Sequence, residues 1–195
     1  IVPAVHSQLE EMMSFAESIR SGCKKGVTDR HFTNVLHIGA GGSLTGPMMV
    51  LKALTSYQHP DIQIDFVGNA DSSDLQAKLR KLDPATTLVV IASKTFSTQE
   101  TILNAETMKK WMLERLGPSS LSKHFVAITG NKNRANSFGI IDQNIFEIFS
   151  LYTQNDSLPY IRISIDLFQQ QFIITIGHIT YPGISLGLCN SQSVY

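Results

Sequence analysis

Residues 88–101 read LVVIASKTFSTQET, and this stretch decides the fold class. Its first five residues are apolar, as in a parallel β-strand covered on both faces, and a helical pattern follows to Leu116. The turn between them carries four hydroxyl groups and one ammonium group, on Ser93, Lys94, Thr95, Ser97 and Thr98. A helix start offers unpaired backbone N–H groups and the positive end of a helix dipole. This turn is therefore expected to bind an anion such as phosphate.

A second strand, turn and helix of the same kind lies upstream, where residues 35–47 read VLHIGAGGSLTGP. The β pattern breaks at Gly39, and Ser43 is expected to cap a helix that runs to about Thr55. In a parallel sheet, ligands bind beyond the carboxyl ends of the strands, where both loops would fall. The two loops are expected to hold a small phosphorylated ligand between them.

Strand-like and helical segments alternate along most of the chain. The expected strands are residues 34–38, 63–67, 87–92, 125–129 and 145–149. The expected helices are residues 5–21, 43–55, 72 to about 81, and 98–116. This order predicts an α/β fold with a doubly wound, mostly parallel five-stranded sheet flanked by helices.

Composition and charge argue against several classes of partner. Sixteen Lys and Arg balance sixteen Asp and Glu, and no basic run appears, so no nucleic-acid partner is expected. The apolar runs are shorter than the roughly 20 residues that cross a bilayer, so no membrane partner is expected. Cys23 and Cys189 lie far apart, without a CxxC pair or a metal-binding spacing, which predicts two unlinked thiols and no metal. No signal peptide is visible, which favours a cytoplasmic location.

Each loop also has a plainer interpretation. Residues 39–43 could mark only a tight turn with close helix–strand packing, or could bind a dinucleotide. The third glycine of the GxGxxG fingerprint would fall at Leu44, so contact with a phosphate or a sugar is favoured. In the other loop, Ser97 or Thr98 could simply cap the helix, and Ser97 has Glu100 at capping-box spacing. A cap needs one hydroxyl group, whereas this loop has four beside a lysine, so phosphate is favoured again.

Lys94 and the histidines admit more than one role. A Schiff-base lysine needs burial or a neighbouring cation to lower its pKa, and the sequence indicates neither, so contact with a phosphate or an enediolate is favoured. The six histidines share no common spacing. His37 and His124 lie at expected strands and are interpreted as core or edge residues rather than ligands.

Three motifs occur in a characteristic order: IGAGGSLTGP at residues 38–47, FVGNAD at 66–71 and ASKTFSTQET at 92–101. They resemble the IGIGGSDLGP, FVSNVDG and SKTFTTQET segments of the glucose-6-phosphate isomerase (phosphoglucose isomerase) family, in its first sugar isomerase (SIS) domain. The resemblance covers about residues 4–147 and includes the segment around Phe138 to Glu147.

The resemblance implies a SIS-type fold and the interconversion of glucose 6-phosphate and fructose 6-phosphate through a cis-enediol, with a Glu base and no cofactor. It implies substrate-binding roles for Gly42, Ser43, Ser93, Lys94, Thr95, Phe96, Ser97 and Thr98. Within this set, Ser93, Thr95 and Thr98 would bind the phosphate, and Ser43 and Lys94 would lie near the sugar. Family members usually form dimers with active sites completed across subunits, so a homodimer is the implied assembly.

The sequence departs from the family pattern after residue 147. The family has a GGRYS-type segment whose Arg stabilises the enediolate, where residues 150–157 here read SLYTQNDS. The base Glu, the ring-opening His and a late Lys belong to parts of the family chain absent here, so no catalytic residue is identified. We expect a SIS domain at residues 1–147 and an irregular, divergent tail at residues 148–195. A shifted reading frame, a truncated gene or true divergence would each give this pattern.

Two functions follow from these expectations. The first is an incomplete glucose-6-phosphate isomerase that binds the sugar phosphate but lacks the catalytic Arg, Glu and His. The alternative is a non-catalytic SIS-type sensor or regulatory module, in which sugar phosphate controls a partner or the oligomeric state. A ligand-dependent change of oligomeric state would separate the two.

Overall fold

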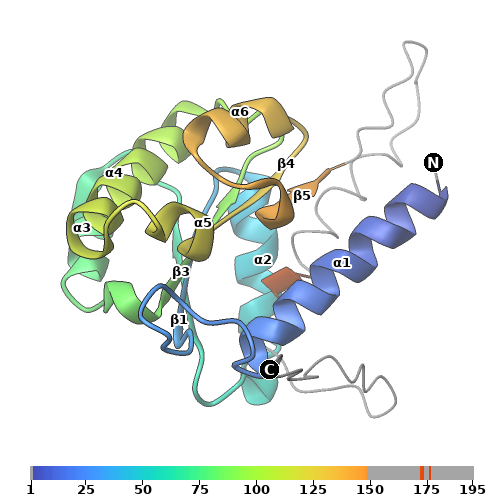
Figure 1. The fold of residues 1–195 in the computed structure, drawn as a ribbon, viewed down its shortest axis with the longest axis horizontal. Helices are drawn as coiled ribbons and strands as arrows, with labels where there is room; N and C mark the ends of the chain where they lie inside the picture. Colours follow the sequence, from blue (N-terminus) through green and yellow to red (C-terminus); the bar gives the residue numbers. More distant parts are fainter. Residues whose placement is uncertain (1, 149–171, 174–175, 177–195) are drawn as a thin grey trace, which may run out of the picture.

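The computed structural model describes residues 2–148, 172–173 and 176 (Figure 1). Its centre is a five-stranded sheet with the order β2-β1-β3-β4-β5, in which every neighbouring pair is parallel. The strands are β1 (Asn34–Ile38), β2 (Gln63–Val67), β3 (Thr87–Ala92), β4 (Phe125–Thr129) and β5 (Ile145–Glu147). The predicted α/β fold with a parallel five-stranded sheet is confirmed. The predicted end of the last strand, residue 149, lies outside the described residues.

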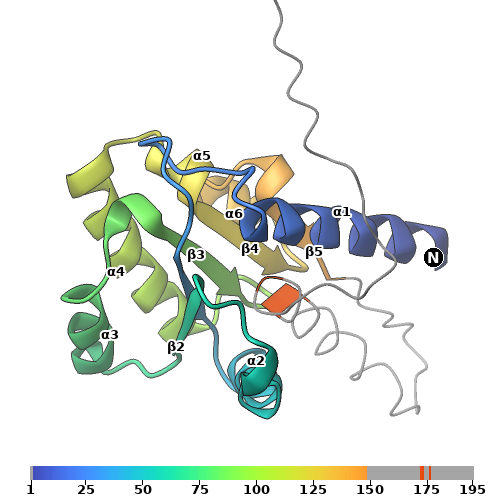
Figure 2. The same ribbon diagram turned by 90° about the horizontal axis from the view of Figure 1, so that it is seen from below.

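Helices cover both faces of the sheet (Figures 1 and 2). One face packs against α1 (Val2–Arg20) and α2 (Gly42–Ala53). The other face packs against α3 (Ser72–Leu79), α4 (Gln99–Leu116), α5 (Ser120–His124) and α6 (Lys132–Phe138). Short 3₁₀ helices form at η1 (Thr55–Tyr57), η2 (Pro84–Thr86) and η3 (Asp142–Asn144). The sheet is thus doubly wound, as predicted.

The core consists of two apolar clusters, one on each side of the sheet. Successive residues of a strand point to opposite faces, and β3 shows this clearly. Leu88, Val90 and Ala92 lie in the cluster under α1, whereas Val89 and Ile91 lie in the cluster under α4. All six residues of β3 are buried, which explains why the sequence of this strand is almost entirely apolar.

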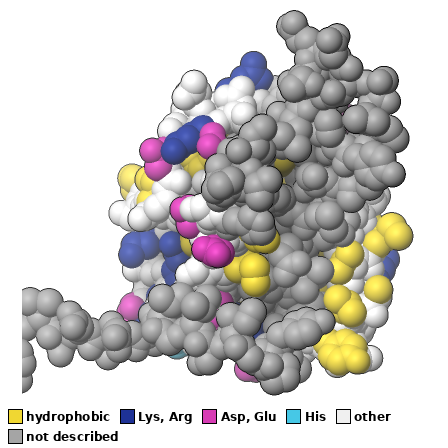
Figure 3. Space-filling view, turned by 90° about the vertical axis from the view of Figure 1, so that its right-hand side faces the viewer, with side chains coloured by type: hydrophobic (Ala, Val, Ile, Leu, Met, Phe, Trp, Pro, Cys, Tyr) yellow, Lys and Arg dark blue, Asp and Glu magenta, His cyan; other side chains and the backbone are white. Residues whose placement is uncertain are grey.

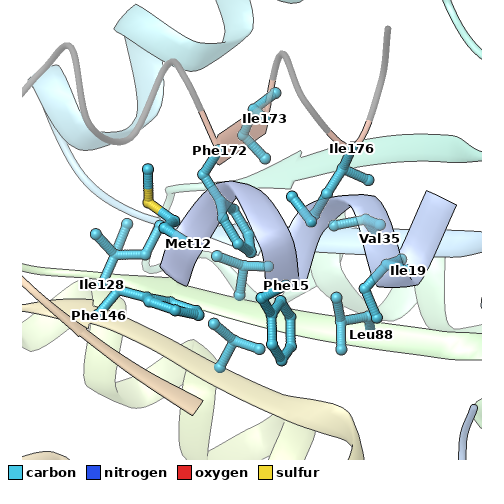
Figure 4. Close-up of a cluster of buried hydrophobic side chains, with 14 of the residues drawn as sticks. Met12, Phe15, Ile19, Val35, Leu88, Ile128, Phe146, Phe172, Ile173 and Ile176 are labelled. Atoms are coloured by element: carbon cyan, nitrogen blue, oxygen red, sulfur yellow. The ribbon is translucent and has the colours of Figure 1, made fainter. Parts of the chain in front are cut away.

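Aromatic side chains organise the cluster under α1 (Figure 4). Phe15 of α1 meets Phe146 of β5 edge to face, with ring centroids 5.3 Å apart. Phe172 stacks on Phe15 at 6.1 Å, and Ile173 and Ile176 join the same cluster with no exposed surface. These three residues belong to the segment predicted as an irregular tail, and they pack in the core. The rest of that segment lies outside the described residues.

Two local predictions are wrong. Ser43 does not cap α2, because the chain turns at Gly41, whose φ of 56° is in the left-handed region, and the helix has already begun at Gly42. Cys23 is disulfide-bonded, contrary to the prediction of an unlinked thiol. The prediction for Cys189 lies outside the described residues.

Candidate functional site

The structure brings the two loops together at the carboxyl edge of the sheet. β1 and β3 are neighbours, with Ile38 in register with Ile91, and the loops at residues 39–41 and 93–98 follow their last residues. The first loop leads to α2 on one face and the second to α4 on the other (Figure 2). In the strand order 2-1-3-4-5, this divergence between β1 and β3 is the switch point where doubly wound sheets bind ligands.

The hydroxyl groups of the second loop form two pairs. Ser93 Oγ and Thr98 Oγ1 lie 3.2 Å apart, and Ser97 Oγ donates to Thr95 Oγ1 at 2.7 Å. Ser93 is buried, whereas Thr95 and Ser97 are exposed. The N-cap residue of α4 is Thr98, and its side chain makes no capping hydrogen bond to the described residues. The simple capping interpretation of this loop is therefore wrong. The hydroxyl groups instead bond to one another beside the positive end of an 18-residue helix.

Phe96 holds the loop in a strained conformation. Its φ of 48° lies in the left-handed region, which costs a bulky residue about 1–3 kcal/mol. The ring is only 4% exposed and packs edge to face on Phe138, with centroids 5.7 Å apart. The phenyl ring of Phe96 therefore points into the core, and any contact of this residue with a ligand would come from its backbone.

The end of β4 fixes the backbone of the same loop. The carbonyl oxygen of Lys94 accepts hydrogen bonds from Gly130 N at 2.9 Å and from Thr129 Oγ1 at 3.3 Å. A Cβ atom at Gly130 would lie 3.1 Å from that oxygen, so the two loops are in close contact. The side chain of Lys94 is partly exposed. These bonds hold the backbone of the loop at Lys94.

The glycine loop after β1 is packed closely against its surroundings. A Cβ atom at Gly39 would lie 2.7 Å from Ser43 O, and one at Gly68 would collide with the side chain of Leu44. Leu44 stands at the position where a dinucleotide fingerprint would have its third glycine. Its side chain occupies the space over the loop that follows β2. Gly42 is exposed and Ser43 is partly exposed, so both can reach a ligand at the sheet edge.

The sequence interpretation missed one polar contact that supports the site. Asn104 of α4 is 2% exposed and donates from Nδ2 to the carbonyl oxygen of Asn69 at 2.8 Å. This bond ties the helix that carries the hydroxyl loop to the loop after β2. The available signal was an Asn in the apolar stripe of α4, beside Ala105 and Met108, because a buried amide needs a partner.

Charge around the two loops favours an anion. Neither residues 39–43 nor residues 93–98 contain Asp or Glu. Asp71, in the loop after β2, accepts hydrogen bonds from Ser73 Oγ and Ser73 N, and these bonds lower the pKa of its carboxyl group.

In the described part of the chain, no three His, Cys, Asp or Glu side chains gather in a way that could hold a metal ion. The described helices also include none with the length and apolar character of a membrane span.

His37 and His124 are core residues, as predicted, although His124 is the last residue of α5 and not part of a strand. His124 is fully buried; its Nδ1 donates to Thr87 O at 2.8 Å and its Nε2 accepts from Val27 N at 2.9 Å. Burial lowers the pKa of His124. His37 is also fully buried, and its Nε2 lies 2.7 Å from Ser43 O.

Comparisons with known proteins point to one family. Residues 1–158 match the family model of phosphoglucose isomerase. The chain is 46% identical over 150 residues to the glucose-6-phosphate isomerase of Methylococcus capsulatus, and 42% identical over 151 residues to glucose-6-phosphate isomerase 1 of Chromohalobacter salexigens. These alignments cover 76% and 77% of this chain, but only 28% of the length of each relative.

Solved structures show the same fold. A glucose-6-phosphate isomerase from Chlamydia trachomatis matches 74% of this chain and 26% of its own chain, with a TM-score of 0.58 and 26% identity. The sugar isomerase domain of the RpiR transcription factor from Sphaerobacter thermophilus matches 90% of this chain and 84% of its own, with a TM-score of 0.53. The identity to that domain is 15%, so this likeness concerns the fold alone.

Proposed function

The chain belongs to the phosphoglucose isomerase family, and we propose that it forms the sugar-phosphate-binding part of a glucose-6-phosphate isomerase. The supporting observation is the pair of loops at the β1–β3 switch point, one with four hydroxyl groups and a lysine and the other with glycines and Ser43. The chain spans 28% of the length of its curated relatives, so the activity of a whole isomerase is part of the proposal.

In this proposal the phosphate group lies at the start of α4. The hydroxyl groups of Ser93, Thr95 and Thr98 bind its oxygens, and the helix dipole and backbone N–H groups add to the attraction. Each hydrogen bond to a charged group contributes about 1.5–3 kcal/mol, so three or four would give micromolar binding after the entropy losses. The paired hydroxyl groups would exchange their mutual bonds for bonds to phosphate, while the buried ring of Phe96 keeps the loop in place.

The sugar would extend from the phosphate toward the glycine loop, where Ser43 and the Lys94 side chain can reach it. In the proposed reaction, a proton moves between C2 and C1 through a cis-enediol, without a metal or organic cofactor. We assign no general base among the described residues. We therefore expect this chain to bind sugar phosphate without useful turnover, because a positioned base contributes about 10²–10⁴ in rate.

Assembly and location belong to the same proposal. Large apolar side chains are exposed at Met49 on α2 and Tyr57 in η1, by 68% and 62%. Figure 3 shows several apolar side chains close together near the right-hand edge of the face in view. Exposed apolar surface of this kind is common at subunit contacts, which supports a homodimer. We also propose a cytoplasmic location, where the phosphorylated sugars of central metabolism occur.

The alternative is a non-catalytic sugar-phosphate sensor. It is supported by the two loops themselves, because a binding module needs such a site but needs no general base, and we assign none among the described residues. Sedimentation velocity with and without glucose 6-phosphate separates the two functions. A change of oligomeric state on binding favours the sensor, and an unchanged state favours the isomerase part.

Calorimetric titration of the purified chain tests the proposal. We expect glucose 6-phosphate and 6-phosphogluconate to bind and free glucose not to bind. Thr98→Ala should weaken binding by about tenfold or more, since one hydrogen bond to a charged group is lost. Thr107→Ala on the same helix is the matched control, because Thr107 lies more than two turns further along and its hydroxyl group donates to Leu103 O. Equal binding of glucose and glucose 6-phosphate, or unchanged affinity in Thr98→Ala, would contradict the proposal.

A further inference from the structure

A proline inside α2 deprives one carbonyl group of its usual helical partner. In an α-helix, the N–H of each residue donates to the carbonyl oxygen four residues earlier. Pro47 lies within α2 and has no N–H, so the carbonyl of Ser43 does not receive this bond. Ser43 belongs to the first turn of α2 and is one of the residues proposed to contact the sugar.

A histidine from the neighbouring strand donates to the same oxygen. His37 Nε2 lies 2.7 Å from Ser43 O, and a carbonyl can only accept, so Nε2 carries the proton. His37 is on β1 and has no exposed surface, and its ring centroid lies 5.4 Å from that of Phe66. The strand thus supplies the hydrogen bond that Pro47 cannot.

The surroundings keep the ring in this one form. His37 Nδ1 is buried and has no hydrogen-bond partner among the described residues, so a proton there would be unsatisfied. Burial lowers the pKa of His37 to about 4, and the ring stays neutral near pH 7. A Cβ atom at Gly39 would lie 2.7 Å from Ser43 O, so the strand end and the helix start approach closely enough for this contact.

We propose that His37 is a positioning residue of the ligand site, which replaces the donor missing at Pro47 and so fixes the first turn of α2 against the end of β1. A bond from an ordinary helical N–H would join α2 only to itself, whereas the bond from His37 joins the helix start to the sheet. The position of Ser43 beside the switch point then follows from the strand. The effect on ligand binding rests on the proposed sugar-phosphate site, but the hydrogen bond itself does not.

A double-mutant cycle with His37→Leu and Pro47→Ala tests this inference. In the Pro47→Ala background, the new N–H of residue 47 can donate to Ser43 O, so the loss of the imidazole should matter less. We expect His37→Leu to weaken glucose 6-phosphate binding about tenfold in the natural background and about twofold or less beside Pro47→Ala. His37→Gln should retain most of the affinity, because its side-chain amide can also donate. Equal losses in both backgrounds would overturn the inference.

Two further readouts separate this inference from the proposed function. If the unaltered chain does not bind glucose 6-phosphate, the proposed function fails, and the same cycle is then measured through the urea midpoint of unfolding. Coupling between the two substitutions would support the hydrogen bond, and strict additivity would overturn it.

If His37→Leu does not fold, rescue of folding by Pro47→Ala supports the inference, and absence of rescue overturns it. Nitrogen-15 NMR of the imidazole should show the Nε2–H tautomer; an Nδ1–H tautomer would contradict the assignment.

Discussion

Protonation of His37 predicts how the stability of the fold depends on pH. The pKa of His37 is about 4 in the folded chain, below the ordinary 6.5, because the ring is buried. Between these two pH values, the unfolded chain binds a proton at this histidine and the folded chain does not. The free energy of unfolding therefore falls as the pH drops through this window, and the His37 contribution is level above and below it.

The size of this effect follows from the shift in pKa. One pKa unit corresponds to about 1.4 kcal/mol, so His37 contributes about 3 kcal/mol over the whole window and about 2 kcal/mol between pH 7 and pH 5. Burial also lowers the pKa of His124, which adds a loss of the same sign. The pKa values of Asp71, Asp83 and Asp142 are lowered from 3.8 by hydrogen bonds, and they act at more acidic pH.

The assay is urea unfolding of the natural chain and of His37→Gln at pH 5, 6 and 7. The glutamine variant keeps a donor for Ser43 O but cannot be protonated, and it leaves His124 and the three aspartates unchanged. The natural chain should lose about 2 kcal/mol more than the variant between pH 7 and pH 5. Parallel pH profiles for the two proteins would refute the reasoning, because they would mean that His37 is protonated equally in the folded and unfolded chains.

Three further substitutions have definite expected outcomes. Thr101→Val should stabilise the fold by about 1 kcal/mol in urea unfolding, since the buried Oγ1 of Thr101 has no hydrogen-bond partner among the described residues; a loss of stability would contradict this. Gly39→Ala should cost about 1–3 kcal/mol and weaken glucose 6-phosphate binding, because its Cβ would press on Ser43 O; unchanged affinity would count against the close approach. Phe96→Ala should lower the free energy of unfolding by about 3 kcal/mol, because its ring packs on Phe138, and should also weaken glucose 6-phosphate binding by loosening the loop. Full affinity in calorimetry would contradict the role of this loop in the site.

Much of the fold was predictable because the strands have a simple physical signature. β3 and β4 are buried at every position, so their residues are almost all apolar and their limits are clear in the sequence. α5 and α6 were not predicted. They are short and largely polar, and α6 is stabilised by the burial of Ala135 and Phe138 and by Asn131, which accepts a bond from Arg134 N. Such helices depend on tertiary contacts more than on their own pattern.

The candidate site was predictable as two loops, but not in its internal geometry. Motif spacing located both loops, and the order of the strands brought them to one edge of the sheet. The direction of the Phe96 ring depends on a left-handed backbone at that residue, which packing against Phe138 imposes. The contact between His37 and Ser43 depends on how closely the chain turns at Gly39 and Gly41. No local propensity encodes either arrangement.

The central claim is that residues 39–43 and 93–98 form one sugar-phosphate site. The most direct measurement is a titration of the nitrogen-15-labelled chain with glucose 6-phosphate, followed by backbone amide NMR with free glucose as the control. The account predicts saturable shifts of the amides of both loops and of the first turns of α2 and α4, with little response to glucose. Shifts confined to one loop or located elsewhere, or no shift at millimolar glucose 6-phosphate, would contradict it.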